Sequence, residues 1–202
     1  MSKDQGKDPL RRYREKRDFT LTAEPQGSVA PSASGDPRFV VQRHRASRLH
    51  YDFRLEIDGV LASWSVPKGP TLDPSTRRLA VRVEDHPLDY FDFEGVIPTG
   101  GYGGGDVVVW DWGTWRSGHG DPAHDLAAGD LHLDLHGEKL GGRFALVRRG
   151  KPSSTREQWL LVHKDDDAAV RGWNPEDYPR SVRSGLTNDE VVERGTRPAG
   201  LG

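Results

Sequence analysis

The segment over residues 49–57 alternates between side chains that could do chemistry and side chains that could build a core. Successive side chains of a β-strand point to opposite faces. One face would therefore carry the polar residues His50, Asp52, Arg54 and Glu56, and the other the apolar residues Tyr51, Phe53, Leu55 and Ile57. The polar face combines an imidazole and a carboxylate, which are metal ligands, with a guanidinium that can bind phosphate.

A metal site is the first chemistry that this face suggests. His44 precedes His50 by six positions, and a turn over residues 45–49 could bring it beside His50 and Asp52. Two imidazoles and one carboxylate suit a divalent metal that keeps open positions for water or substrate. The alternative is a solvated polar face, which is the commoner explanation for an isolated His-x-Asp pair.

A second triplet has similar spacing but different surroundings. His132, Asp134 and His136 would also share one face of a strand. No Arg or Lys accompanies them on that strand, and the leucines between them indicate a half-exposed edge strand. We interpret this triplet as a solvated strand face without a site.

Further cations and a third histidine distinguish the first group. Over residues 78–86 one parity carries Arg78, Arg82, Glu84 and His86, whereas the other carries Leu79, Val81 and Val83. Lys68 and Tyr90 stand close to these segments in the chain. A shared surface would suit phosphoryl chemistry, in which a metal polarises an oxygen or activates water, cations neutralise charge, and an imidazole donates a proton.

Short strands would position these side chains. Asp58-Gly59 predicts a tight hairpin turn. We expect strands over residues 39–44, 50–57, 60–66, 78–84, 90–95, 106–112, 131–136, 143–148 and 158–163. Because no long helical pattern interrupts them, we predict an all-β fold, a small closed or partly closed antiparallel β-barrel with a short N-terminal helix and irregular tails.

Three parts are expected along the chain. Residues 1–37 would form a basic arm, with a helix from about Leu10 to Arg17 capped by Asp8 and a mobile connector over residues 24–37. Residues 38–170 would form the barrel, and residues 171–202 a C-terminal extension. Residues 1–54 hold 12 Lys and Arg against 7 Asp and Glu, although the whole chain carries a net charge of −2. This imbalance favours a local polyanion contact, with an ordinary basic tail as the alternative.

Composition excludes several classes of site. The absence of cysteine excludes disulfides and thiolate metal ligands and fits a reducing cytosol. We expect neither a signal peptide nor a membrane span. The glycine-rich residues 100–105 predict a turn rather than a phosphate cradle, and Trp110, Trp112 and Trp115 predict core or barrel-rim packing rather than a base-stacking platform.

Several motifs together resemble one family. They are FVVQRH at residues 39–44, RLHYDFR at 48–54, SVPKG at 65–69, EDHPLDY at 84–90 and FEGVIP at 93–98. The chain from about residue 11 to about residue 163 resembles the 3'-phosphoesterase module of bacterial and archaeal ATP-dependent DNA ligase D. This resemblance implies a β-barrel that releases a 3'-terminal ribonucleoside from DNA and then removes the 3'-phosphate, leaving a 3'-hydroxyl for ligation in double-strand break repair.

The resemblance also implies roles for individual residues. His44, His50 and Asp52 would bind a divalent metal, manganese or another divalent transition metal. Arg54 and His86 would contact the scissile phosphate. The supporting residues would be Gln42, Lys68, Arg78 and Tyr90, together with Arg17 and Glu24 from a segment that folds over the groove. The implied partners are DNA 3' ends, a separate ligase or polymerase and a Ku-like end-binding protein, for a cytoplasmic, nucleoid-associated monomer.

Two other functions remain open. The chain contains no Lys-x-Asp-Gly ligase motif, so it would act alone or be a piece of a longer enzyme. It could instead be a non-catalytic module that binds DNA ends and recruits a ligase. His50, Asp52 and His86 also fit the facial triad of non-haem iron oxygenases, although Arg54, Lys68 and Arg78 exceed what such an enzyme needs.

Overall fold

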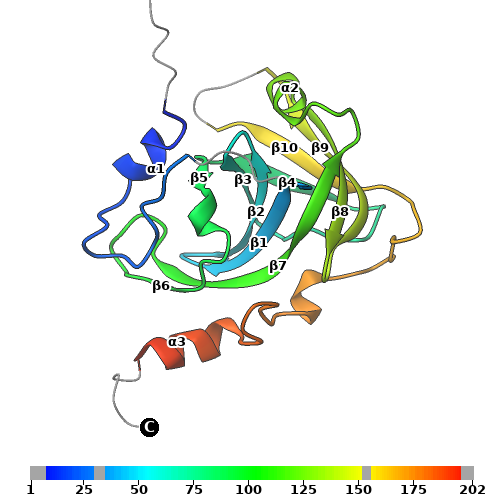
Figure 1. The fold of residues 1–202 in the computed structure, drawn as a ribbon. Helices are drawn as coiled ribbons and strands as arrows, with labels where there is room; N and C mark the ends of the chain where they lie inside the picture. The colour runs from blue at the N-terminus through cyan, green and yellow to red at the C-terminus, as the bar shows by residue number, and fades with distance from the viewer. Residues whose placement is uncertain (1–7, 30–34, 152–155, 197–202) are drawn as a thin grey trace, which may run out of the picture.

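The computed structural model describes residues 8–29, 35–151 and 156–196, and its strands form one closed antiparallel barrel (Figure 1). The barrel strands in spatial order are β1 (Arg38–Arg45), β2 (Leu49–Ile57), β3 (Val60–Val66), β4 (Arg77–Arg82), β10 (Gln158–His163), β9 (Gly141–Arg149), β8 (Asp130–Gly137) and β7 (Gly105–Ser117). Pairing of β1 with β7 closes the ring. The predicted all-β barrel is confirmed.

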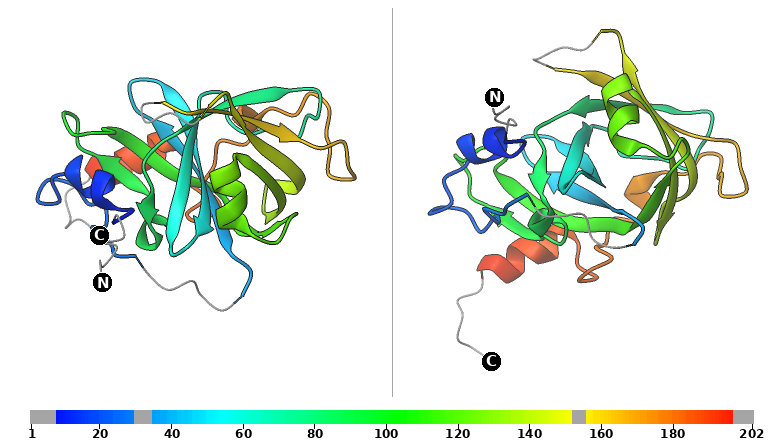
Figure 2. Two further views of the ribbon diagram at one scale, coloured as in Figure 1. Left: turned by 90° about the horizontal axis from the view of Figure 1, so that it is seen from above. Right: turned by 45° about the horizontal axis from the view of Figure 1, so that its top comes forward.

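Two short strands and five short helices complete the described structure. The strands are β5 (His86–Pro87), which pairs with β3, and β6 (Gly95–Ile97), which pairs with β7. The helices are α1 (Arg11–Glu15), η1 (Leu88–Tyr90), α2 (Pro122–Ala128), η2 (Pro175–Asp177) and α3 (Asn188–Thr196). Figure 2 shows α2 beside β8 and α3 running along β6 and β7. None of the described helices is long and apolar enough to cross a membrane.

The alternation of β2 determines what lies inside the barrel. Its apolar residues Tyr51, Phe53 and Leu55 are buried in the main core together with Trp64 and Trp110. Burial of each such side chain contributes roughly 1.5–3 kcal/mol. The polar face of β2 therefore points away from the barrel interior, as predicted.

A second apolar cluster covers part of this outer face. It contains Tyr13, Val40, Leu61, Tyr90 and Val109, with partly buried aromatic residues around it. Tyr13 comes from α1, so the N-terminal segment is packed onto the outside of β1 and β3. The polar residues of β2 thus lie between two apolar clusters.

The β2–β3 hairpin has the turn that the sequence predicts. Asp58 has φ 49° and Gly59 has φ 77°. Two consecutive left-handed residues match the right-handed twist of the flanking strands, which is why Asp-Gly is favoured there. The turn sets Arg54 opposite Ser63 and Asp52 opposite Ser65.

The predicted polarity of β4 is wrong. Ser65 pairs with Val81 and Trp64 pairs with Arg82, so Val81 shares the outer face with Ser65 and Asp52. Arg82 lies on the core side, with its guanidinium 4.8 Å from the Trp64 ring centroid. Long arginine stems can cover apolar surface while the charged head reaches a partner, so period-two alternation did not identify the buried face.

The strand predicted over residues 90–95 is also wrong. Residues 88–90 form the 3₁₀ helix η1, and the strand β6 begins only at Gly95. The Gln42 side-chain amide donates to the carbonyls of Tyr90 and Phe93, at 3.2 and 2.9 Å. A buried side chain therefore satisfies carbonyl groups that a neighbouring strand would otherwise bind.

Three smaller predictions are corrected. The triplet strand β8 pairs with both β7 and β9, so it is not an edge strand. The helix α1 ends before Arg17, and Leu10 rather than Asp8 holds the N-cap position. Glu24 is buried and fixed by hydrogen bonds, so the predicted mobile connector does not begin there, and residues 30–34 of that connector lie outside the described residues. Trp110 and Trp115 are core residues, as predicted.

A buried carboxylate joins β7 to the β8–β9 turn. Asp111 accepts backbone N–H bonds from Glu138, Lys139 and Leu140 at 2.8–3.0 Å. We expect Asp111→Ala to lower the free energy of unfolding by about 2–3 kcal/mol, because the buried Leu140 N–H loses its acceptor. Urea unfolding would measure this loss, with the half-exposed Asp134→Ala on β8 as the matched control.

The destabilisation caused by Asp111→Ala should depend on pH in one direction. Burial raises the pKa of Asp111 to about 6, although the backbone N–H bonds oppose the shift. A carboxyl whose folded pKa is raised contributes stability that is lost as the pH rises through that pKa. The Asp111→Ala deficit should therefore be larger at pH 5 than at pH 8, and an equal deficit at both values would contradict this assignment.

Candidate functional site

The expected metal-ligand residues converge on the outer face of β1 and β2. His44 is directly opposite His50 in the strand pair, and Asp52 follows two positions along β2. One ligand atom from each of the three lies within 4.8 Å of the others, and no other such group occurs among the described residues. The His132–His136 triplet therefore does not form a comparable cluster.

The hydrogen bonds of the two imidazoles leave ring nitrogens for a cation. His50 Nδ1 lies 3.0 Å from the Arg48 carbonyl oxygen, so Nδ1–H donates and Nε2 keeps its lone pair. His50 Nε2 lies 3.5 Å from Asp52 Oδ1. His44 Nε2 is buried and has no hydrogen-bond partner among the described residues. A buried ring nitrogen without a hydrogen-bond partner, next to a second imidazole and a carboxylate, fits a site for a divalent metal.

Asp52 is held in its ionised form. Burial alone would raise its pKa, but the Arg54 guanidinium and the imidazoles of His44 and His50 lower the pKa well below its usual range. An ionised carboxylate is the form that binds a metal.

Arg54 is a buried guanidinium with neighbours on several sides. Its Nε donates to Gln42 Oε1 at 2.8 Å, its Nη2 to Asp52 Oδ2 at 3.0 Å and its Nη1 to Ser63 Oγ at 2.9 Å. Gln42 is itself anchored to the η1 region, so the guanidinium is held in a single orientation. Sequence reasoning did not identify Ser63, although the hairpin register opposite Arg54 contained the signal.

His86 lies between two guanidinium groups. Its Nδ1 is 2.9 Å from both Arg54 Nη1 and the Glu84 carbonyl oxygen, and its Nε2 is 3.2 Å from Arg17 Nη2. Burial, followed by the charges of Arg54 and Arg17, lowers the pKa of His86 well below its usual value. The ring is therefore neutral and carries one N–H. It accepts from Arg17 at Nε2 when Nδ1 is protonated, and from Arg54 at Nδ1 when Nε2 is protonated.

The N-terminal segment supplies the outer part of this network. Arg17 Nε donates to Glu24 Oε1 at 2.8 Å, and the Tyr90 hydroxyl donates to the same oxygen at 2.9 Å. The Tyr13 hydroxyl donates to the Pro25 carbonyl at 2.5 Å. Residues 13–25 therefore fold over β5 and η1 and bring Arg17 to His86.

Two predicted residues are not part of this network. Arg78 lies on the core-side face of β4, opposite to Val81, and its buried Nε has no hydrogen-bond partner among the described residues. Lys68 is exposed beyond the end of β3, two positions after the residue that pairs with Tyr51, and has no polar partner in the described part of the chain. Neither side chain has a contact with the ligand cluster or with Arg54 among the described residues.

The facial triad of His50, Asp52 and His86 is not assembled. Arg54 stands between its members, since the guanidinium contacts Asp52 through Nη2 and His86 through Nη1. The third member of the observed cluster is His44. This arrangement removes the geometric basis for the oxygenase alternative.

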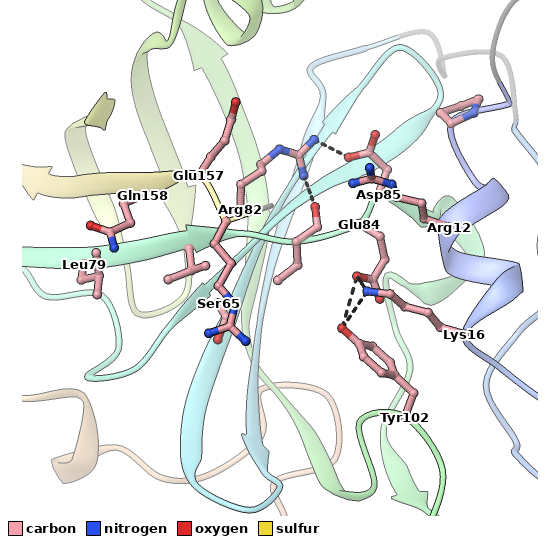
Figure 3. Close-up of a pocket in the computed structure, with 14 residues that line it drawn as sticks. Arg12, Lys16, Ser65, Leu79, Arg82, Glu84, Asp85, Tyr102, Glu157 and Gln158 are labelled. Atoms are coloured by element: carbon pink, nitrogen blue, oxygen red, sulfur yellow. Dashed lines mark hydrogen bonds and ion pairs between the residues drawn. The ribbon is translucent and has the colours of Figure 1, made fainter. Parts of the chain in front are cut away.

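An open groove lies across β3 and β4 (Figure 3). It has a volume of about 910 Å³ and is lined by Pro9, Arg12, Lys16, Ser65, Leu79, Val81, Arg82, Val83, Glu84, Asp85, Tyr102, Arg156, Glu157 and Gln158. Within this lining, Ser65 pairs with Asp52 on one side and with Val81 on the other.

Comparison with known proteins identifies relatives of this chain. A family model described as "DNA Ligase D 3'-phosphoesterase domain" matches residues 42–148. The multifunctional non-homologous end joining protein LigD of Pseudomonas aeruginosa is 56% identical over 206 residues, which cover 96% of this chain and 24% of that protein.

Two mycobacterial relatives are also similar to this chain. The LigD proteins of Mycobacterium tuberculosis and Mycolicibacterium smegmatis are 45% and 41% identical, over 76% and 85% of this chain and 19% and 22% of their own length. The chain thus spans 19–24% of the length of these relatives.

Proposed function

Because the chain belongs to the DNA Ligase D 3'-phosphoesterase domain family, we propose that it is a metal-dependent phosphoesterase that heals the 3' ends of DNA. It cleaves the phosphodiester that holds a 3'-terminal ribonucleoside and then removes the remaining 3'-phosphate. The observation that supports this most strongly is the convergence of His44, His50 and Asp52 next to the buried Arg54–His86 pair.

His44, His50 and Asp52 hold the divalent metal, with manganese as the proposed ion. A bound metal would polarise a phosphate oxygen and lower the pKa of a bound water. The Asp52 carboxylate belongs to the metal site and also binds the Arg54 guanidinium. A phosphate bound at the metal would therefore lie next to Arg54.

Arg54 binds the non-bridging oxygens of the scissile phosphate. Gln42 and Ser63 hold its guanidinium in place before substrate arrives, so no reorganisation is needed when charge develops on the phosphate. Arg17 contributes a second positive charge through the N-terminal segment, and Glu24 positions it.

His86 handles the proton of the leaving oxygen. It is neutral without substrate because burial and two guanidinium groups lower its pKa. An arriving phosphate offsets those positive charges and raises the pKa of His86, so the imidazole can carry a proton to the leaving group. The exposed Lys68 would meet the approaching strand, and Tyr90 supports Glu24. No role follows for Arg78 from its position.

The relatives are named for non-homologous end joining, and we extend this context to the chain. Its substrates would be DNA 3' ends in double-strand break repair near the nucleoid. A ligase, a polymerase and a Ku-like protein would be its partners.

A manganese assay tests this proposal. A duplex with one 3'-terminal ribonucleotide should yield first a strand shortened by one nucleoside with a 3'-phosphate, and then a 3'-hydroxyl end. Addition of a chelator should stop both steps. Binding of DNA ends without any turnover in manganese would instead favour a non-catalytic end-binding module.

A further inference from the structure

The groove beside the catalytic residues has an apolar floor. Leu79, Val81 and Val83 line it from β4 and the residue that follows, and Leu79 is 39% exposed. The floor begins at Ser65, directly opposite Asp52 in the β2–β3 pair. An occupant of the groove would therefore lie next to the strand that carries Asp52 and Arg54.

An aromatic side chain stands where the groove meets the metal-ligand residues. Tyr102 is 47% exposed, and its hydroxyl lies 2.9 Å from Lys16 Nζ. Lys16 Nζ is also 4.3 Å from the centroid of the Tyr102 ring. A Cβ on the next residue, Gly103, would be only 3.8 Å from His44 Cε1, so this loop borders the ligand cluster. Exposed aromatic rings next to a nucleic-acid active site are platforms for base stacking.

The lining of the groove is close to balanced in charge, with the basic residues Arg12, Lys16, Arg82 and Arg156 and the acidic residues Glu84, Asp85 and Glu157. Lys16 Nζ binds Glu84 Oε2 at 2.8 Å, and Arg82 forms a short ion pair with Asp85 (Figure 3). A polynucleotide strand brings a negative charge with every nucleotide. A groove with nearly balanced charges and an apolar floor suits a neutral occupant better than a polyanionic strand.

We infer that this groove binds the terminal ribonucleoside that leaves in the diesterase step, with its base against Tyr102 and the β4 floor. This inference rests on the proposed function. A 3'-terminal nucleoside carries no phosphate beyond the scissile one, so it matches the nearly balanced charge of the groove. The groove volume of about 910 Å³ falls within the range of small-molecule sites, about 300–1,000 Å³.

Two substrates separate this subsite from the catalytic centre. On a duplex ending in a ribonucleotide, Tyr102→Ala should lower kcat/KM about tenfold, because the base loses its stacking partner. On the same duplex ending in a 3'-phosphate, kcat/KM should stay within about twofold, since the nucleoside is absent. Tyr102→Phe keeps the ring and should retain both activities. Equal losses on the two substrates would overturn the inference, because the groove would then bind the upstream strand.

The floor has a closely matched control. Leu79 and Val147 are 39% and 38% exposed, and both pair with Leu160, from opposite sides of β10. Only Leu79 lines the groove. Leu79→Asn should reduce ribonucleotide release selectively, whereas Val147→Asn should change neither activity. The same effect from both variants would contradict a role for the β4 floor.

A binding measurement is independent of turnover. Titration with adenosine, followed by NMR, should shift the resonances of Leu79, Val81 and Tyr102 in the wild-type chain but not in Tyr102→Ala. Absence of shifts at these residues would overturn the inference even for an active enzyme. A wild-type chain that cleaves neither substrate would refute the proposed function, while the adenosine shifts would still decide whether the groove binds a nucleoside.

Discussion

His50→Ala is expected to eliminate manganese-dependent cleavage of both the 3'-ribonucleotide and the 3'-phosphate substrate. The Nδ1 atom of His50 is hydrogen-bonded to a backbone carbonyl, so Nε2 is the ring nitrogen left to bind a metal. His50 Nε2 faces Asp52. Loss of a metal that supplies about 4 kcal/mol of transition-state stabilisation would lower kcat about 1,000-fold. Steady-state assays on both substrates would measure this loss.

Metal binding gives a second readout for the same variant. Electron paramagnetic resonance of manganese titrated with protein should show tight binding to the wild type and little binding to His50→Ala. Because His50 is partly exposed at the rim, the fold should survive, which circular dichroism can verify.

The chain provides its own control for this prediction. His132 and Asp134 on β8 repeat the His-x-Asp spacing of His50 and Asp52, but they do not join a ligand cluster. His132→Ala should therefore leave activity and manganese binding unchanged. Loss of manganese binding in His132→Ala, with binding retained in His50→Ala, would reverse the assignment of the metal site.

Arg54→Lys is expected to lower kcat at least about 100-fold on both substrates, although the positive charge is kept. One ammonium cannot replace a planar fork that contacts Gln42, Asp52 and Ser63 at once. The alignment of the planar guanidinium with a phosphate is also lost, which reduces the stabilisation of the transition state by about 3 kcal/mol. Single-turnover rates would separate this effect from product release.

The same substitution should affect stability. The side chain of Arg54 is only 3% exposed, so the buried acceptors Gln42 Oε1 and Ser63 Oγ would lose their donor. We expect a loss of about 2–4 kcal/mol in the free energy of unfolding. Thermal or urea unfolding would measure it.

Arg38 supplies the matched control for Arg54. Its Nε binds Glu56 Oε2 at 2.8 Å, and this arginine–carboxylate pair joins β1 to β2. The Arg38 side chain is 40% exposed and lies outside the catalytic network. Arg38→Lys should change kcat less than about twofold, because exposed ion pairs contribute little. A comparable loss in both variants would point to general damage of the sheet rather than to phosphate binding.

Local sequence was sufficient to predict the ligand cluster. His44, His50 and Asp52 lie within nine positions, and a short reversal between β1 and β2 places them together. Alternation in β2 also identified the polar outer face, because its apolar residues are large and uninterrupted. The Asp58-Gly59 turn then determined the register of Ser63 against Arg54.

Alternation failed where both faces of a strand can be buried. In β4, Arg78 and Arg82 occupy the core-side parity, whereas Leu79 and Val81 face the groove. The register with β3 decides this orientation, and a residue pattern contains no information about which partner a strand will meet. The strand predicted over residues 90–95 was wrong for a related reason, because Gln42 on another strand supplies hydrogen bonds to this segment.

The sequence by itself therefore determined the barrel class, the ligand triad and the arginine beside it, since each depends on spacings of a few residues. Only the tertiary structure decided that Arg17 reaches His86, that Arg78 lies on the core-side face of β4, and that the loop carrying Tyr102 lies between His44 and the groove. These relations join segments far apart in the chain. Packing of the N-terminal segment and the pairing order of the strands create them, and neither is encoded in any single stretch of residues.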